Sequence, residues 1–120
     1  MNQEVTILKA LAEPTRLRLA VLLALNGETC VCRLAEALEA PQFRISRHLG
    51  ILRDRGVVEA RRDGTWMYYR LSEPRSSLET CLQGCLRECF ADDATIQGDS
   101  ARFVRGECGA QPPEKLPPQK

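Results

Sequence analysis

The residues with the clearest chemical potential are six cysteines. Two of them, Cys30 and Cys32, form a C-x-C pair that can bring two thiolates near one point. Soft thiolate ligands select soft or borderline ions, including As(III), Sb(III), Cd(II), Pb(II), Cu(I) and Zn(II). A cysteine thiol is equally an ordinary small buried apolar group. The spacing alone therefore leaves ion binding and core packing open for this pair.

The other four cysteines give weaker signals. Cys81, Cys85 and Cys89 recur at steps of four, which places them on one face of a helix. They can form a site alone, reach across to the C-x-C pair, or pack at an interface, and we expect packing. Cys108 stands in a segment expected to be a tail, where it can act as a flexible ligand.

Residues 41–71 carry a second signal, which is positive charge on a short helix. Ile45, Leu49 and Leu52 recur at helical spacing and predict a face that packs inward. Gly56 follows where a residue with positive φ commonly ends a helix. The other face can hydrogen-bond base edges and phosphates in a major groove. It carries Gln42, Arg44, Ser46, Arg47 and His48.

Two strand-like runs, residues 57–62 and 65–71, follow this helix. Asp63-Gly64 between them is a strong short-range signal for a β-hairpin. Arg61 and Arg62 flank the predicted tip, and Thr65 follows it. This hairpin is expected to act as a basic wing against the DNA backbone or minor groove.

The rest of the chain predicts helices that support the basic unit. Apolar spacing predicts helices over residues 3–13, 15–25 and 78–90, the last capped by Ser77. A third helix is expected to begin near Cys30 to Cys32 and to end before Ala40-Pro41, which gives a helix-turn-helix in outline. Arg16 and Arg18 can contact the DNA backbone or remain solvated surface charges.

Length and composition bound the fold. A chain of 120 residues with 43% hydrophobic content fits one compact domain, which we place at residues 1–92. Residues 93–120 are expected to form a largely disordered C-terminal tail, because their end is rich in proline. No apolar run is long enough for a membrane span, and no secretory signal is evident, so we expect a cytoplasmic protein with reduced thiols.

The stretches S-R-H-L-G-I-L-R-D-R-G-V-V and R-R-D-G-T-W-M-Y-Y-R-L resemble the ArsR/SmtB family of winged-helix repressors that respond to metals and metalloids. The likeness covers roughly residues 5–90. It implies a mainly α fold with a small β-hairpin, a winged helix-turn-helix of about five helices. It also implies a homodimer formed through the first and last helices, which binds double-stranded operator DNA with an inverted repeat and requires no cofactor.

The segment E-T-C-V-C-R-L resembles the E-L-C-V-C-D-L inducer motif of the arsenic-responsive members. The resemblance implies that Cys30 and Cys32 are thiolate ligands of As(III) or Sb(III), whose binding releases the DNA. Two positions depart from the motif. Arg33 replaces the usual aspartate, and Ala35 stands where some members have a third cysteine. As(III) favours three thiolates, so a third sulfur would have to come from elsewhere in the chain or from a small thiol.

Other functions remain open at this point. The same fold can sense Cd(II), Pb(II) or Zn(II), which prefer four ligands and can recruit the cysteines of residues 81–89. Oxidation of Cys30 and Cys32 can make a redox-switch repressor. The family's metal sites that need histidines are disfavoured, because His48 is the single histidine. An enzyme is not expected, because the sequence holds no catalytic constellation.

Overall fold

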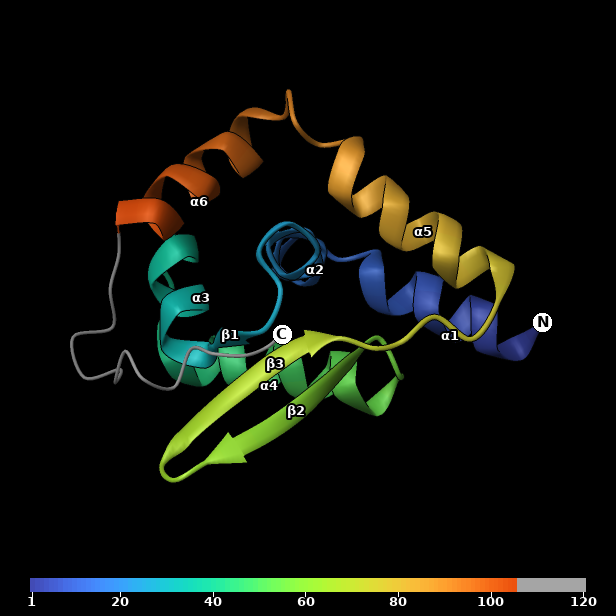
Figure 1. The fold of residues 1–120 in the computed structure, drawn as a ribbon, viewed down its shortest axis with the longest axis horizontal. Coiled ribbons are helices and arrows are strands. Elements are labelled where there is room, and N and C mark those ends of the chain that lie inside the picture. Colours follow the sequence, from blue (N-terminus) through green and yellow to red (C-terminus); the bar gives the residue numbers. More distant parts are fainter. Residues whose placement is uncertain (106–120) are drawn as a thin grey trace.

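The computed structural model describes residues 1–105 as six helices and a three-stranded antiparallel sheet (Figure 1). In chain order the elements are α1 (Asn2–Leu11), α2 (Pro14–Asn26), β1 (Thr29–Cys30), α3 (Val31–Leu38), α4 (Gln42–Asp54), β2 (Val58–Asp63), β3 (Trp66–Leu71), α5 (Ser77–Glu88) and α6 (Ala94–Arg105). The winged helix-turn-helix expected from the sequence is confirmed. None of the helices within this range is long and apolar enough to cross a membrane.

Helix α2 forms the centre of the fold. Figure 1 looks along its axis, and the other helices surround it. Leu19 and Leu22 on α2 are fully buried, and Leu34 of α3 joins them in one continuous core. Pro14 occupies the first turn of α2, where its missing N–H leaves no unpaired donor. The apolar spacing of the sequence therefore predicted this central helix correctly.

Helices α3 and α4 form the helix-turn-helix. Ile45, Leu49 and Leu52 are fully buried, as their spacing predicted. The turn before α4 places Glu39 in the left-handed region, with φ of 54°. Gly56 ends the second helix with φ of 85°, which confirms the expected stop. The outward face of α4 is consequently fixed by the packing of its inward face.

Strands β2 and β3 form the predicted hairpin, in register from Val58 opposite Leu71 to Asp63 opposite Trp66. The connecting residues are Gly64 and Thr65, so the turn lies one residue later than the sequence indicated. Gly64 has φ of 65°, a conformation that favours glycine. The hairpin also pairs with a strand that the sequence did not reveal, the two-residue β1.

The predicted boundary at residue 92 is wrong, because residues 94–105 form a sixth helix rather than a tail. Ile96, Asp99 and Phe103 lie at helical spacing on its buried face. The carboxylate of Asp93 accepts a hydrogen bond from the backbone N–H of Ile96 at 3.1 Å and so caps this helix. The residue that caps α5 is Ser76, one position before the predicted Ser77. Its hydroxyl oxygen accepts a hydrogen bond from the backbone N–H of Glu79. Residues 106–120, with the predicted proline-rich tail, lie outside the described range.

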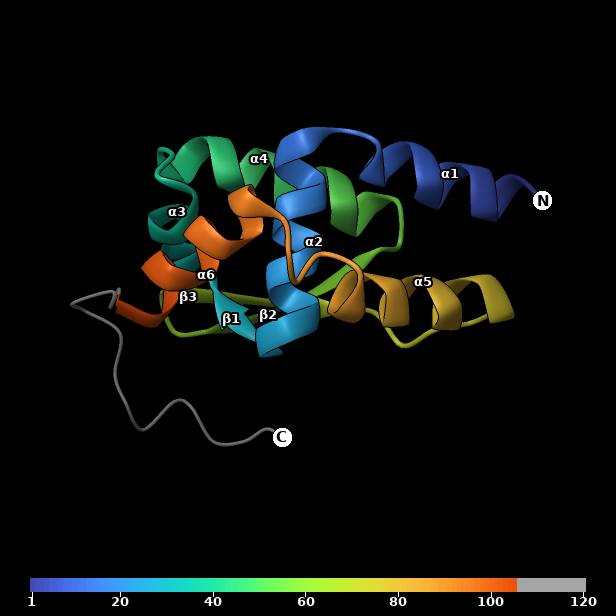
Figure 2. The same ribbon diagram turned by 90° about the horizontal axis from the view of Figure 1, so that it is seen from above.

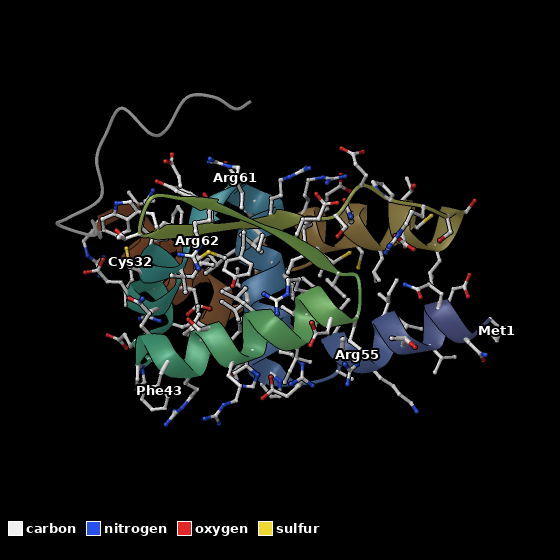
Figure 3. All side chains as sticks on the ribbon, turned by 90° about the horizontal axis from the view of Figure 1, so that it is seen from below. Met1, Cys32, Phe43, Arg55, Arg61 and Arg62 are labelled. Atoms are coloured by element: carbon white, nitrogen blue, oxygen red, sulfur yellow. The ribbon has the colours of Figure 1, made fainter. Side chains whose placement is uncertain are left out.

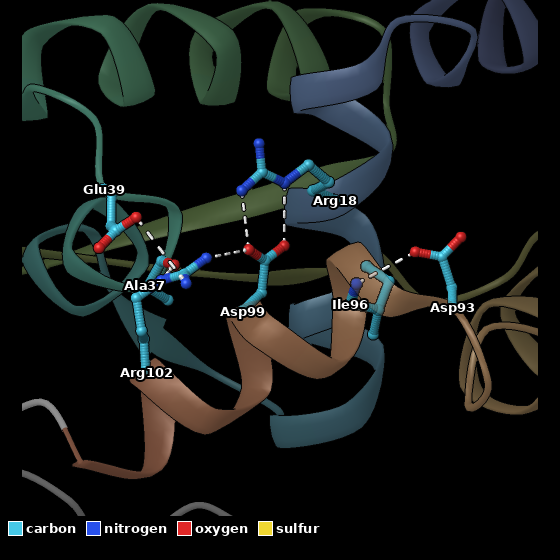
Figure 4. Close-up of polar contacts among 7 residues, drawn as sticks. All are labelled: Arg18, Ala37, Glu39, Asp93, Ile96, Asp99 and Arg102. Carbon is cyan, nitrogen blue, oxygen red and sulfur yellow. Dashed lines mark hydrogen bonds and ion pairs between the residues drawn. The ribbon is translucent and has the colours of Figure 1, made fainter.

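A buried carboxylate anchors α6 to its neighbours (Figure 4). Arg18 donates to both oxygens of Asp99, at 2.9 and 2.7 Å, and Arg102 donates to Oδ1 at 2.9 Å. Arg102 also donates to the carbonyl oxygen of Ala37, on α3, at 2.7 Å. The hydrogen bonds that Arg18 donates to Asp99 raise the pKa of Arg18. The structure therefore uses Arg18 to hold α6 against α2, and the predicted alternatives of DNA contact and solvated charge are both wrong for this residue.

Seen from above, α6 lies beside α3, while α1 and α5 lie together at the other end of the molecule (Figure 2). A small space of about 20 Å³ separates α1 from α5 and is lined by Ile7, Leu11, Leu82 and Leu86, among other residues. Val5 and Leu8 of α1 are exposed. An apolar edge is thus left uncovered on the pair of helices expected to form the dimer interface.

Substitution of Asp99 by alanine is expected to lower the free energy of unfolding by about 3 kcal/mol, because two guanidinium groups lose their buried partner. Urea denaturation followed by circular dichroism measures this change. Asp92→Ala, at an exposed position two residues before α6, is the control and should change the stability by less than about 0.5 kcal/mol. Equal unfolding midpoints for the two variants would contradict the anchor role of Asp99.

Candidate nucleic-acid interface and thiol site

The outward face of α4 presents the polar side chains that the sequence predicted. Gln42, Arg44 and Arg47 are exposed, and Ser46 is half-buried. Neither arginine makes an ion pair within residues 1–105. Two uncompensated positive charges on the second helix of a helix-turn-helix suit contact with a phosphate backbone.

Phe43 lies on the same outward face and was missed by the sequence interpretation. Its side chain is 65% exposed and points away from the protein in Figure 3. An exposed aromatic ring on a groove-reading helix can contact the methyl group of thymine. The signal was present in the sequence, since Phe43 falls outside the buried stripe of Ile45 and Leu49.

His48 faces the protein more than the solvent. Its Nδ1 atom lies 3.3 Å from Nη1 of Arg16, and 3.9 Å from a carboxylate oxygen of Glu13. Arginine only donates, so the histidine nitrogen accepts this hydrogen bond. Arg16 also donates to the carbonyl oxygen of Ala10 at 2.7 Å. His48 thereby ties α4 to the junction of α1 and α2, which is the structural alternative to a direct DNA contact.

The two wing arginines differ in their surroundings. Arg61 donates to both oxygens of Glu28, at 3.0 and 2.8 Å, and its guanidinium lies 4.8 Å from the ring centre of Tyr68. The hydrogen bond to Glu28 raises the pKa of Arg61. Arg62 is exposed, and it forms no ion pair with any other residue of 1–105. Thr65 is exposed at the tip of the wing. Arg62 therefore offers the freer charge for a phosphate.

The C-x-C pair lies where the sheet meets the helix-turn-helix. Cys30 is fully buried in β1, opposite Tyr68 of β3, and Cys32 is half-buried in the first turn of α3. Their Sγ atoms are 3.2 Å apart. Burial raises the pKa of the Cys30 thiol, while the backbone N–H groups of Cys32 and Arg33 oppose the rise. Two sulfur atoms thus converge on one point beside a helix N-terminus that supports a thiolate.

The cysteines of α5 lie apart from this pair. Cys81, Cys85 and Cys89 are exposed, and α5 and α3 lie on opposite sides of α2 in Figure 1. A hydrogen bond with Cys89 raises the pKa of Cys85. No group of three potential metal ligands from His, Cys, Asp or Glu gathers anywhere in residues 1–105. Cys108, the remaining predicted ligand, falls outside that range.

Comparison with known proteins decides the family. Residues 13–60 match the family model for bacterial regulatory proteins of the arsR family. The chain is 52% identical over 107 residues to the arsenic resistance transcriptional regulator ArsR1 of Pseudomonas putida. The match covers 88% of this chain and 80% of that protein. The chain belongs to the ArsR family.

Other similar proteins include regulators named for arsenical resistance and for cadmium resistance. The arsenical resistance operon repressor of Escherichia coli is 47% identical over 68 residues, covering 57% of this chain and 58% of that protein. A homologue of the cadmium resistance regulatory protein CadC from Staphylococcus aureus is 37% identical over 67 residues, covering 56% of this chain and 55% of that protein. The resemblance drawn from the sequence is therefore confirmed at the level of the family.

Solved structures agree with this assignment. Reduced HlyU from Vibrio cholerae matches with a TM-score of 0.65 and 31% identity, over 75% of this chain and 90% of that chain. The homodimeric winged helix-turn-helix DNA-binding domain of a possible ArsR-family regulator from Mycobacterium bovis matches with a TM-score of 0.61 and 32% identity, over 78% of this chain and 82% of that chain. This ArsR-family chain is accordingly a DNA-binding transcriptional repressor and not an enzyme.

The unequal wing arginines generate a prediction for DNA binding. Arg62→Ala should weaken binding and lower the slope of log affinity against log salt concentration by about 1, because one phosphate contact is lost. Arg61→Ala should leave the slope nearly unchanged, because Glu28 already neutralises that guanidinium. Fluorescence anisotropy on the promoter fragment at several salt concentrations measures both slopes. A larger slope change for Arg61→Ala would reverse the assignment.

Proposed function

We propose that this chain is a homodimeric repressor that leaves its operator when As(III) or Sb(III) binds the thiolates of Cys30 and Cys32. The observation that carries the proposal is the 3.2 Å separation of the two Sγ atoms at the junction of wing and helix-turn-helix. The arsenic-resistance names of relatives at 52% and 47% identity support the choice of inducer. The inducer acts as a signal, and no resident cofactor is required.

The dimer is proposed to form through α1 and α5. Val5 and Leu8 supply exposed apolar area there, and the exposed cysteines of α5 extend it. A two-fold dimer places its two α4 helices in successive major grooves of an inverted-repeat operator, with the wings on the flanking DNA. The proposed DNA contacts are Gln42, Arg44, Ser46, Arg47, Arg62 and Thr65, with His48 and Arg61 acting through their protein partners. We propose that the protein acts in the cytoplasm, where it would meet its operator DNA.

We expect the thiol pair to be coupled to the DNA-binding surface through the elements that hold the cysteines. Cys30 belongs to β1, which is hydrogen-bonded to strand β3 of the wing. Cys32 belongs to α3, which packs against α4. An ion that draws the two sulfur atoms around itself displaces the start of α3 and strains the β1–β3 pairing. A coupling of about 1 to 3 kcal/mol is typical of allosteric proteins and would suffice for release.

The double variant Cys30→Ser/Cys32→Ser should bind operator DNA normally and no longer respond to arsenite, because it lacks both thiolates. Arg47→Ala should show the reverse, with operator affinity lowered by about 1 to 3 kcal/mol and arsenite binding intact. Anisotropy on the promoter fragment, with arsenite titrated into the reduced protein, measures both properties. Arsenite release that survives the double substitution would move the sensor to another cysteine.

Sensing of Cd(II), Pb(II) or Zn(II) is the nearest alternative, favoured by the cadmium-regulator relative and by the exposed cysteines of α5. Proton balance separates these ions. As(OH)₃ gives up hydroxide as it accepts thiolates, so thiol protons leave as water. A divalent metal ion instead releases those protons to solution.

Because burial raises the pKa of Cys30, the thiol is protonated at neutral pH and a divalent ion must displace that proton. Cadmium affinity should therefore rise with pH, by about tenfold per pH unit for each proton released, while arsenite affinity stays nearly flat. Titrations between pH 6 and pH 8 test this difference. An arsenite affinity that rises as steeply as that of cadmium would contradict the exchange chemistry.

A redox switch is the second alternative, because cysteine sulfur atoms are open to oxidation and those of Cys30 and Cys32 lie 3.2 Å apart. Its signature is loss of DNA binding under peroxide in the absence of any metal or metalloid, reversed by a reductant. Retained DNA binding under peroxide, together with release by arsenite, excludes this alternative.

A further inference from the structure

Helices α2, α5 and α6 enclose a groove of about 420 Å³. Figure 1 shows α5 and α6 on either side of α2. The lining is mostly apolar and includes Leu25 of α2, Phe90 at the end of α5 and Val104 of α6. Leu25 and Val104 are exposed, and Phe90 is half-buried. A space of this size with an apolar lining is typical of sites that bind small molecules.

Two polar side chains of the lining have groups to offer to a ligand. Arg87 of α5 is exposed, and its guanidinium makes no ion pair or hydrogen bond with any other residue of 1–105. The hydroxyl of Ser100, half-buried on α6, has no hydrogen-bond partner in that range either. Among the described residues that line the groove, none is acidic. An arginine at the edge of an apolar groove complements a ligand with an apolar body and an oxyanion.

We propose that this groove binds a small amphipathic anion, whose apolar body lies between α5 and α6 and whose negative group meets Arg87. The hydroxyl of Ser100 is available to a polar group of the same ligand. None of the residues involved belongs to the thiol pair or to the DNA-reading face of α4. The proposed site therefore stands or falls independently of metalloid sensing.

The groove lies on a different side of α5 from the proposed dimer interface. On α5 that interface uses the exposed stripe of Cys81, Cys85 and Cys89. Successive residues of an α-helix are about 100° apart, so Arg87 lies about 160° around the helix from Cys85 and from Cys89. A dimer formed through α1 and the cysteine stripe consequently leaves the groove open to a small molecule.

Helix α6 connects the groove to the helix-turn-helix. Arg33 of α3 donates a hydrogen bond from Nη2 to the carbonyl oxygen of Phe103 at 2.8 Å, and its guanidinium lies 4.0 Å from the centre of the Phe103 ring. Farther along α3, the carbonyl oxygen of Ala37 accepts a hydrogen bond from Arg102. The C-terminal end of α6 is therefore held at the first turn of α3, and a ligand in the groove contacts this same helix.

Fluorescence titration of the full-length protein with two related dyes tests the proposal. 8-Anilinonaphthalene-1-sulfonate has an apolar ring system with one negative charge, and N-phenyl-1-naphthylamine has the same rings without the charge. The native protein is expected to bind one sulfonate dye per protomer. Arg87→Gln should weaken binding of the sulfonate dye by about three- to fivefold, as for an exposed ion pair, and leave the neutral dye unaffected. Arg105→Gln, an exposed arginine outside the groove, is the control and should change neither affinity.

A second pair of variants locates the dye. Ala101→Trp places a large ring in the groove and should weaken binding of both dyes at least about tenfold, whereas Ala94→Trp, on the same helix but outside the lining, should not. Undiminished binding in Ala101→Trp, or equal loss of both dyes in Arg87→Gln, would overturn the proposal. A native chain that binds no sulfonate dye would do so too. Light scattering is the last check, because conversion of a dimer to a monomer by Ala101→Trp would mean that a second copy covers the groove instead.

Discussion

The buried carboxylate of Asp99 is the constraint on which the arrangement around the thiol pair depends. A carboxylate with no solvent exposure is costly unless cations and hydrogen bonds compensate it, and Arg18 and Arg102 do so from two sides. Since Arg18 belongs to α2 and Arg102 also donates to the Ala37 carbonyl of α3, these hydrogen bonds hold α6 against both helices. The helix that follows the winged core is thereby part of the folded domain, with its end at the first turn of α3.

Local patterns were sufficient to predict the parts of the fold that depend on neighbours in sequence. The stripe of Ile45, Leu49 and Leu52 gave the inward face of α4, and Asp63-Gly64 gave the hairpin to within one residue. Two elements depend instead on distant partners. Strand β1 is only two residues long and exists because Thr29 and Cys30 pair with β3. The local pattern does not predict helix α6, because its buried face includes the charged Asp99, whose partner Arg18 lies 81 residues away.

The candidate site shows the same division. The sequence indicated which side chains are cationic, and it placed Arg44 and Arg47 correctly on the outward face of α4. It could not indicate which cations already have partners, because Arg18 and Arg61 meet their carboxylates only in the folded chain. Residue type alone does not predict a role for Phe43, because this side chain is apolar. Its exposure becomes informative only once the structure places it on the outward face of α4. Charge counted along the sequence therefore overstates the surface available to DNA.

If the inducer binds the thiol pair as proposed, thermodynamic linkage makes its effect on the operator reciprocal. Cys30 is bonded through β1 to the wing, and Cys32 opens the helix that packs on α4, so the conformation that fits DNA also fixes the two sulfur atoms. If inducer binding lowers operator affinity by some factor, operator binding must lower inducer affinity by the same factor. The buried Cys30 thiol makes this reciprocal cost larger, because an ion can reach it only when the β1 segment or the first turn of α3 moves. In the proposed mechanism, access to the sulfur and release of the DNA would be two consequences of one displacement.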